Sequence, residues 1–109
     1  PFASVSEFTQ VGEASWYGPG FHGRKTANGE RYNQNGLTAA HKELPLNSVV
    51  RVTHEVTGKS VVVRINDRGP FHGNRVIDMS YAAAKAIGMV NQGKAKVKIE
   101  LLPKGKPTL

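Results

Sequence analysis

The clearest alternation of apolar and polar residues lies in the middle of the chain, in the run VVRVTHEVTGKSVVVRIND over residues 49–67. Two stretches rich in β-branched residues flank Thr57, Gly58 and Lys59, an arrangement that is typical of a β-hairpin. A second alternating run, KAKVKIELL over residues 94–102, sets lysines and a glutamate against aliphatic residues. This second run predicts a half-buried final strand.

One segment predicts a helix, SYAAAKAIG over residues 80–88. Ser80 is a good N-cap, the alanines have high helix propensity, and Gly88 stands where a helix commonly ends. Shorter strands are expected in VGEASWY, residues 11–17, and LTAAH, residues 37–41. The segment between these two strands is dense in Gly, Asn and Pro, and so long a loop in a small domain is either functional or pinned internally.

Many short strands with glycine-rich turns favour a mainly β fold closed into a small barrel, with one or two short helices. The 109 residues, 39% of them hydrophobic, fit one domain with one core. We expect residues 1–10 to form a lead-in segment, residues 11–102 the barrel domain, and residues 103–109 a linker or frayed C-terminal tail.

The net charge of +7 favours an anionic partner, with nucleic acid, acidic lipid headgroups and acidic glycan all open. The chain has no cysteine, which excludes a disulfide framework, a thiolate metal site and a cysteine nucleophile. The spacings of its four histidines match no short zinc pattern, so we expect no metal site. His54, near the turn of the predicted hairpin, is expected to be exposed.

Asp67 ends a predicted strand, where a rigidly held carboxyl group could act as an acid at the rim of a cleft. The alternative is that Asp67 only caps the DRGP turn. Asp78 lies two residues before the helix N-cap and is interpreted as structural, with its carboxylate bonded to backbone amides and complementing the helix N-terminus.

Glu30 ends TANGE and His41 ends LTAAH, and neither follows a capping or amphipathic pattern. A His, a Glu and an Asp that meet in one cleft would indicate a catalytic site, whereas singly they fit a solvated loop acid and a partly buried imidazole. Aromatic residues flank the glycine-rich loop, and they suit sugar rings or simply fill the core. They are Trp16, Tyr17, Phe21 and Tyr32.

The motifs ASWYG, TANGE, LTAAH, NDRGP and IDMS follow one another in this order. From about Gly12 to Leu102 the chain closely resembles the rare lipoprotein A family of bacterial lytic transglycosylases. The resemblance implies a six-stranded double-psi β-barrel, related to the catalytic domains of expansins. Met79 stands where Leu is common in the family, a change of similar volume.

The resemblance also implies the setting of the protein. Its substrate would be peptidoglycan glycan strands free of stem peptides, cleaved at the MurNAc–GlcNAc linkage during cell division at the septum. It would lie in the bacterial cell envelope, in the periplasm, as an outer-membrane lipoprotein in full-length form, with the lipid anchor outside this chain. We expect a monomer with no cofactor and no nucleic-acid partner.

The family's functional residues fall on Glu30, His41 and Asp67. In the implied reaction the C6 hydroxyl of the sugar attacks C1 and closes a 1,6-anhydro ring, so one acid can serve twice. We expect Asp67 to be that acid and base, to carry a proton beforehand, and to be kept protonated by a dry setting or by the charge of Glu30. His41 would position Asp67 or polarise the sugar.

Six further residues are expected to bind the glycan: Trp16, Tyr17, Thr26, Asn28, Tyr32 and Arg68. The basic surface would attract the lactyl carboxylates of muramic acid. A different class of function stays open, a non-catalytic glycan-binding or wall-loosening module of the expansin kind. A nucleic-acid-binding barrel is a third hypothesis.

Overall fold

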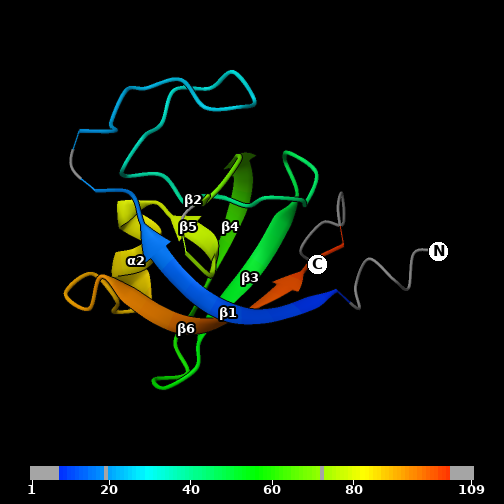
Figure 1. Cartoon of the computed structure of the whole chain (residues 1–109), viewed down its shortest axis with the longest axis vertical. Coiled ribbons are helices and arrows are strands. Elements are labelled where there is room, and N and C mark those ends of the chain that lie inside the picture. The colour runs from blue at the N-terminus through cyan, green and yellow to red at the C-terminus, as the bar shows by residue number, and fades with distance from the viewer. Residues whose placement is uncertain (1–7, 19, 72, 104–109) are drawn as a thin grey trace.

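The protein is a closed barrel of six strands with one short helix in the part of the chain that the structure describes, as drawn in Figure 1. The computed structural model describes residues 8–18, 20–71 and 73–103, so most of the predicted lead-in and tail, and His72, lie outside it. The elements are β1 (Thr9–Trp16), β2 (Thr38–Ala40), β3 (Val49–His54), β4 (Ser60–Asp67), β5 (Arg75–Met79), α2 (Tyr81–Ala86) and β6 (Lys94–Leu101). The predicted six-stranded, mainly β barrel is confirmed.

The strands close in the order β1-β5-β2-β4-β3-β6. The pairs β1–β5 and β2–β4 are parallel, and the other four pairs are antiparallel. The predicted hairpin is the antiparallel pair β3–β4, and the predicted final strand is β6. β5 was not predicted as a strand.

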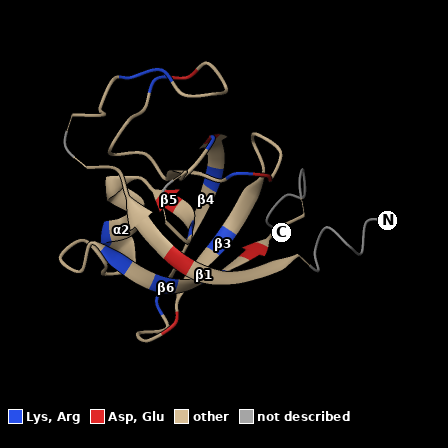
Figure 2. Ribbon diagram, in the orientation of Figure 1, with Lys and Arg blue, Asp and Glu red and all other residues tan. Residues whose placement is uncertain are grey.

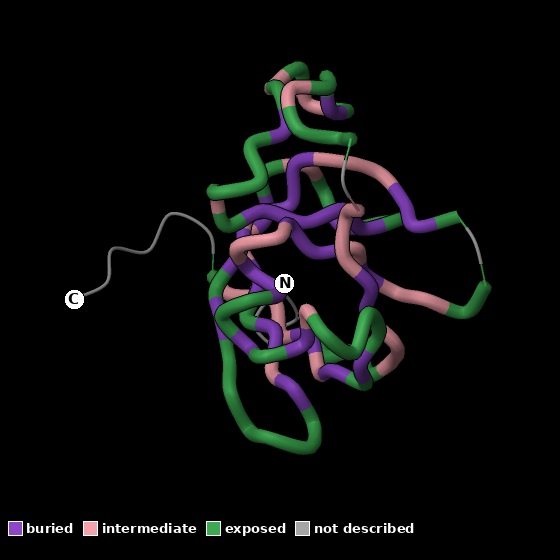
Figure 3. Tube along the Cα trace, turned by 90° about the vertical axis from the view of Figure 1, so that its left-hand side faces the viewer, coloured by how far each residue is buried: buried purple, intermediate pink, exposed green. Residues whose placement is uncertain are grey.

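The core fills the inside of the barrel because alternate residues of each strand point inward. On β4, Val61, Val63 and Ile65 are buried while Val62 is exposed. Figure 3 shows how buried and exposed positions change along the chain. Burying one such side chain stabilises the fold by about 1.5–3 kcal/mol. The largest fully buried apolar side chains are Ile65, Ile77, Met79, Ile87, Met89, Ile99, Val50, Val52, Val63 and Val97.

The predicted helix is confirmed, with the N-cap where the sequence indicates it. The Ser80 hydroxyl accepts a hydrogen bond from the Ala83 amide at 3.2 Å and donates one to the Gly36 carbonyl at 2.7 Å. Gly88, just beyond the helix, has a φ of +77°, a left-handed conformation that glycine adopts without strain. Ser80 therefore starts the helix and also fastens the end of the long loop that precedes β2.

Strand register brings two carboxylates to one end of the barrel. Ala40 on β2 is the register partner of Asp67 on one side and of Asp78 on the other. Ser15 on β1 pairs in turn with Asp78. Adjacent strands lie about 4.8 Å apart, so the Cα atoms of the two aspartates are roughly 10 Å apart across the small Ala40 side chain.

His54 is buried, with only 2% of its surface exposed, so the expectation that it would be exposed is wrong. Its Nδ1 accepts hydrogen bonds from the amides of Val56 and Thr57, and its Nε2 lies 3.0 Å from Oε1 of Gln92. The imidazole thus organises the turn that it was expected only to adjoin.

No helix in the described ranges has the length and apolar content needed to cross a membrane.

Candidate active site

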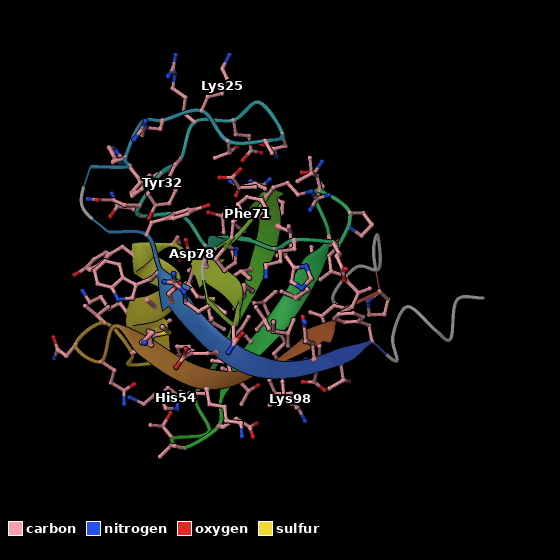
Figure 4. All side chains as sticks on the ribbon, viewed as in Figure 1. Lys25, Tyr32, His54, Phe71, Asp78 and Lys98 are labelled. Carbon is pink, nitrogen blue, oxygen red and sulfur yellow. The ribbon has the colours of Figure 1, made fainter. Side chains whose placement is uncertain are left out.

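A cleft of about 350 Å³ lies over the end of the barrel where β4 and β5 bring their aspartates. We call it the acid cleft. In Figure 4, Tyr32, Phe71 and Asp78 lie at this end, while His54 and Lys98 lie at the other. The walls come from the long loop after β1, from the loop between β4 and β5, and from β5 itself. The lining residues are Tyr17, Phe21, Arg24, Lys25, Thr26, Tyr32, Asp67, Arg68, Gly69, Pro70, Phe71, Arg75 and Asp78.

Asp67 is the best-anchored acid of the cleft. Its Oδ1 accepts hydrogen bonds from the backbone amides of Ala27 and Arg68, each at 2.9 Å, and its Oδ2 accepts one from the Tyr17 hydroxyl, also at 2.9 Å. Two fixed amides hold Oδ1, whereas the hydroxyl beside Oδ2 can either donate or accept. Oδ2 is therefore the oxygen that can take up and release a proton without a change in backbone structure.

Tyr17 follows β1 directly and lines the acid cleft. Its amide donates to the Met79 carbonyl at 2.9 Å, which fixes its backbone to β5. Its ring stacks on Phe21 at a centroid distance of 5.6 Å and meets Tyr32 edge-on at 4.6 Å. Burial, together with the charge of Asp67 and the hydrogen bond to it, raises the pKa of Tyr17 well above its ordinary range. Tyr17 thus acts as a hydroxyl at neutral pH.

Glu30 does not line the acid cleft. Its carboxylate forms a two-pronged ion pair with Arg64 on β4, at 2.6 Å and 3.0 Å, and also accepts a hydrogen bond from Asn66 at 3.2 Å. Hydrogen bonds from Arg64 and Asn66 lower the pKa of Glu30 to about 2. Arg64 balances the charge of Glu30. Glu30 instead fastens the loop to β4.

The ion pair gives a pH prediction for stability. The pKa of Glu30 falls from an ordinary 4.5 to about 2 on folding, so the ionised form stabilises the fold above pH 4.5. This contribution disappears as the pH falls from 4.5 through 2. The side chains are 40% exposed for Glu30 and 38% exposed for Arg64. Because solvent screens such a pair, we expect it to add less than about 1 kcal/mol to the free energy of unfolding.

Thermal unfolding of Glu30→Gln against pH measures this contribution. We expect the variant to lose less stability than the unmodified chain over that acidic range. Glu100→Gln is the matched control, since Glu100 pairs with Arg51 at a longer 3.6 Å and with similar exposure. Identical acid profiles for Glu30→Gln and the unmodified chain would contradict the prediction.

The loop of residues 25–31 is internally pinned, which is one of the two alternatives that the length of the glycine-rich segment left open. The Thr26 amide donates to the Glu30 carbonyl at 2.7 Å, and the Glu30 amide donates to Oδ1 of Asn28 at 3.0 Å. The Asn28 amide in turn donates to the Asn66 carbonyl on β4 at 3.2 Å. Two of the six predicted glycan-binding residues lie in this loop, and of these Thr26 lines the cleft and Asn28 does not. This loop presents the Ala27 amide to Asp67.

His41 does not line the cleft, and both of its ring nitrogens make hydrogen bonds. Nδ1 accepts hydrogen bonds from the amides of Glu43 and Leu44, at 3.0 Å and 3.1 Å, and Nε2 therefore carries the hydrogen and donates to Oε1 of Gln10 at 2.8 Å. Burial is the main cause that lowers the pKa of His41, so the neutral imidazole is favoured. The His41 ring reaches neither Asp67 nor the cleft.

Arg68 links His41 to the cleft. Its Nη1 donates to the carbonyls of His41 and Leu44, at 3.0 Å and 2.6 Å, while Arg68 itself lines the cleft beside Asp67. The His41 imidazole thus holds the turn after β2, and the carbonyls of that turn hold the Arg68 guanidinium, which lines the cleft together with Asp67. His41 thus anchors the turn after β2 and Glu30 anchors its loop to β4. Neither lines the cleft that Asp67 lines, so the three side chains do not converge in one cleft.

Asp78 also lines the acid cleft, and its hydrogen-bond partner differs from the one expected. It lies within β5, and its Oδ1 accepts a hydrogen bond from the Ser15 hydroxyl at 3.0 Å, not from backbone amides near the helix. Burial raises the pKa of Asp78, and the charge of Asp67 adds to the effect, against the opposing influence of Ser15 and Arg75. The signal in the sequence was a carboxylate inside an aliphatic run, RVIDM, that had not been recognised as a strand.

Of the other predicted glycan-binding residues, Tyr17, Tyr32, Thr26 and Arg68 line the acid cleft, and Trp16 lines a neighbouring pocket. Basic side chains also border the cleft. Figure 2 shows further basic residues on β6, which contributes no residue to the cleft lining. Within the described residues no group of three or more His, Asp or Glu side chains is arranged to hold a metal ion.

Comparison with known proteins places this barrel in a family. Residues 9–99 match the family described as lytic transglycolase. The endolytic peptidoglycan transglycosylase RlpA of Neisseria meningitidis serogroup A is 65% identical over 105 residues, which cover 96% of this chain and 44% of that protein. The protein of the same name from Vibrio cholerae is 58% identical over 101 residues, 93% of this chain and 38% of that protein.

Among solved structures, a Clavibacter michiganensis expansin variant in complex with cellohexaose has a TM-score of 0.71 at 16% identity, over 92% of this chain and 53% of that chain. The Streptomyces papain inhibitor has a TM-score of 0.69 at 17% identity, over 87% and 94% of the two chains. These two likenesses concern the fold, while the chain spans less than half the length of the curated relatives. Its sequence similarity over nearly its full length shows that the chain belongs to the lytic transglycolase family.

Proposed function

We propose that this domain cleaves peptidoglycan glycan strands by lytic transglycosylation. The observation that carries the proposal is Asp67, held by two backbone amides and a tyrosine hydroxyl on the floor of an open cleft. Fixed placement of one proton-transferring oxygen is what general acid–base catalysis requires. The names of the family and of its relatives support the same reaction class.

The reaction needs two proton transfers. The C6 hydroxyl oxygen of the muramic acid residue attacks C1 of the same sugar. The O6–C1 bond forms, and the bond between C1 and the glycosidic oxygen breaks. The attacking hydroxyl loses its proton and the leaving oxygen gains one, so the balance requires no water. We assign Asp67 to the attacking hydroxyl, since its Oδ2 accepts only a hydroxyl hydrogen bond and can exchange it for a proton.

Asp78 supplies the cleft with a second carboxyl group. The raised pKa of Asp78 favours its neutral form, which is the form that gives a proton to a leaving oxygen. The two transfers first expected of Asp67 alone are therefore divided between two aspartates roughly two strand spacings apart. Two carboxyl groups can also serve hydrolysis, so the product must be identified chemically.

The charge of the cleft favours an acidic glycan as substrate. Arg24, Lys25, Arg68 and Arg75 border the two aspartates. Strands without stem peptides expose the lactyl carboxylates of muramic acid, and those carboxylates complement these cations. We propose that peptide-free strands are the preferred substrate, in the bacterial cell envelope, with the full-length protein a periplasmic lipoprotein of the outer membrane that acts at the division septum.

Mass spectrometry of the soluble products tests the activity. The domain is incubated with intact and with amidase-stripped sacculi, and we expect products with 1,6-anhydromuramic acid ends, mostly from the stripped material. Reducing ends would mean hydrolysis by the two carboxyl groups. Retention of the domain on the sacculi without products would favour the glycan-binding alternative, which the likeness to an expansin structure supports.

A further inference from the structure

A second pocket of about 300 Å³ adjoins the acid cleft, and Tyr17 lines both. We call it the aromatic pocket. Its other lining residues are Trp16, Gly18, Gln34 and Tyr81. The rings of Trp16, at the end of β1, and Tyr81, at the start of α2, lie 5.5 Å apart with their planes inclined at 58°. None of the lining residues carries a charge at neutral pH, in contrast to the acid cleft.

The Tyr17 hydroxyl is bonded to Asp67, but the other three polar side chains that line this pocket make no hydrogen bond to the described residues. Within the described part of the chain, no hydrogen bond engages the Trp16 indole N–H, the Gln34 side-chain amide or the Tyr81 hydroxyl. The Gln34 backbone is fixed, because its carbonyl accepts from the Ala82 amide at 2.9 Å. Flat apolar faces with free donors and acceptors at their edges match a sugar ring, which has apolar C–H faces and hydroxyl and acetamido groups around its rim.

We propose that the aromatic pocket is a second glycan subsite, selective for an uncharged N-acetylated sugar. The inference rests on the proposed function, in which the acidic muramic acid residue occupies the acid cleft. The glycan strand alternates acidic and neutral sugars, and the two pockets on either side of Tyr17 alternate in the same way. Occupation of both pockets then sets the register that brings a muramic acid residue to Asp67.

Two probes test the subsite by NMR titration without any cleavage. Chitotetraose is uncharged throughout, and a peptide-free tetrasaccharide of alternating muramic acid and N-acetylglucosamine carries carboxylates. Because the chain has one tryptophan, its indole N–H signal reports on the pocket without ambiguity. We expect chitotetraose to shift the Trp16 indole and Gln34 side-chain signals, with an affinity that changes less than about twofold with added salt. The charged tetrasaccharide should lose affinity with salt.

Gln34→Ala and Tyr81→Ala should each weaken chitotetraose binding by about two- to tenfold, the effect of losing one hydrogen bond or one aromatic face. Asn35→Ala, which removes the neighbouring exposed amide outside the pocket, is the matched control and should bind normally. Unshifted Trp16 and Gln34 signals, or equal affinities in all three variants, would overturn the subsite.

Failure of the proposed activity gives a different result. If the domain releases no anhydro products but chitotetraose still shifts the Trp16 signal, the subsite is supported and the transglycosylase activity is refuted. If the domain and its Gln34→Ala and Tyr81→Ala variants all cleave stripped strands equally well, and the Trp16 signal does not shift, the activity is supported and the subsite is refuted.

Discussion

An Asp67→Asn domain is expected to release about a hundred- to ten-thousand-fold less soluble glycan than the unmodified chain, because a carboxamide cannot take up and return a proton. The fold should survive. The amide oxygen of asparagine can accept from Ala27 and Arg68, and its NH₂ group can donate to the Tyr17 hydroxyl, so all three contacts persist with one reversed. Product release by mass spectrometry and thermal unfolding measure the two quantities separately.

Glu100→Gln controls for the loss of an acid at a distance, since Glu100 lies on β6 in a surface ion pair with Arg51. It should cleave normally. Asp67→Asn that folds normally and cleaves at the unmodified rate would show that Asp67 is not needed. Asp78→Asn would then be the decisive variant, because Asp78 is the other carboxyl group that lines the acid cleft.

Local signals in the sequence were sufficient for the elements that form from neighbouring residues. The β3–β4 hairpin, the Ser80 cap and β6 each depend on a turn, a cap or an alternation that lies within the element itself. The closed six-stranded barrel was predicted only from the resemblance to the family. Periodicity alone indicated a small barrel without its strand number or order.

Neither β5 nor the position of Asp78 in the cleft could be predicted from neighbouring residues in the sequence. β5 has five residues and is followed at once by a helix. It pairs in parallel with β1, where Ser15 and its partner Asp78 are 63 positions apart in sequence. A carboxylate before a helix cap looks like a dipole partner until the strand is known. The meeting of Asp67 and Asp78 across Ala40 is a product of barrel closure, which no single segment encodes.

The two buried histidines show how similar residues can be misjudged. His41 and His54 make the same contacts, with Nδ1 accepting from the amides two and three residues later and Nε2 bonded to a glutamine. His41 is linked to the acid cleft only through Arg68, whereas His54 lies at the opposite end of the barrel, as Figure 4 shows. The shared geometry favours a structural role for both imidazoles, and we propose that His41 affects cleavage only through Arg68.

His41→Ala is expected to lower the free energy of unfolding by about 2–4 kcal/mol, since it leaves a cavity and removes the acceptor of two backbone amides. His54→Ala should lose a similar amount, because it removes the same contacts. Denaturant unfolding of both variants tests this equivalence. Cleavage should separate them, with only the His41 variant impaired, since only the turn after His41 holds Arg68.

His41→Asn distinguishes positioning from proton transfer. Asparagine commonly accepts hydrogen bonds from amides two or three residues later, so it can keep the turn and Arg68 in place without an imidazole. If His41 is a positioning residue, the asparagine variant should cleave within about tenfold of the unmodified chain, because it removes no proton-transferring group. If the ring itself transfers a proton, asparagine and alanine should both lose about a hundredfold or more. The neutral, fully hydrogen-bonded ring leads us to expect the first result.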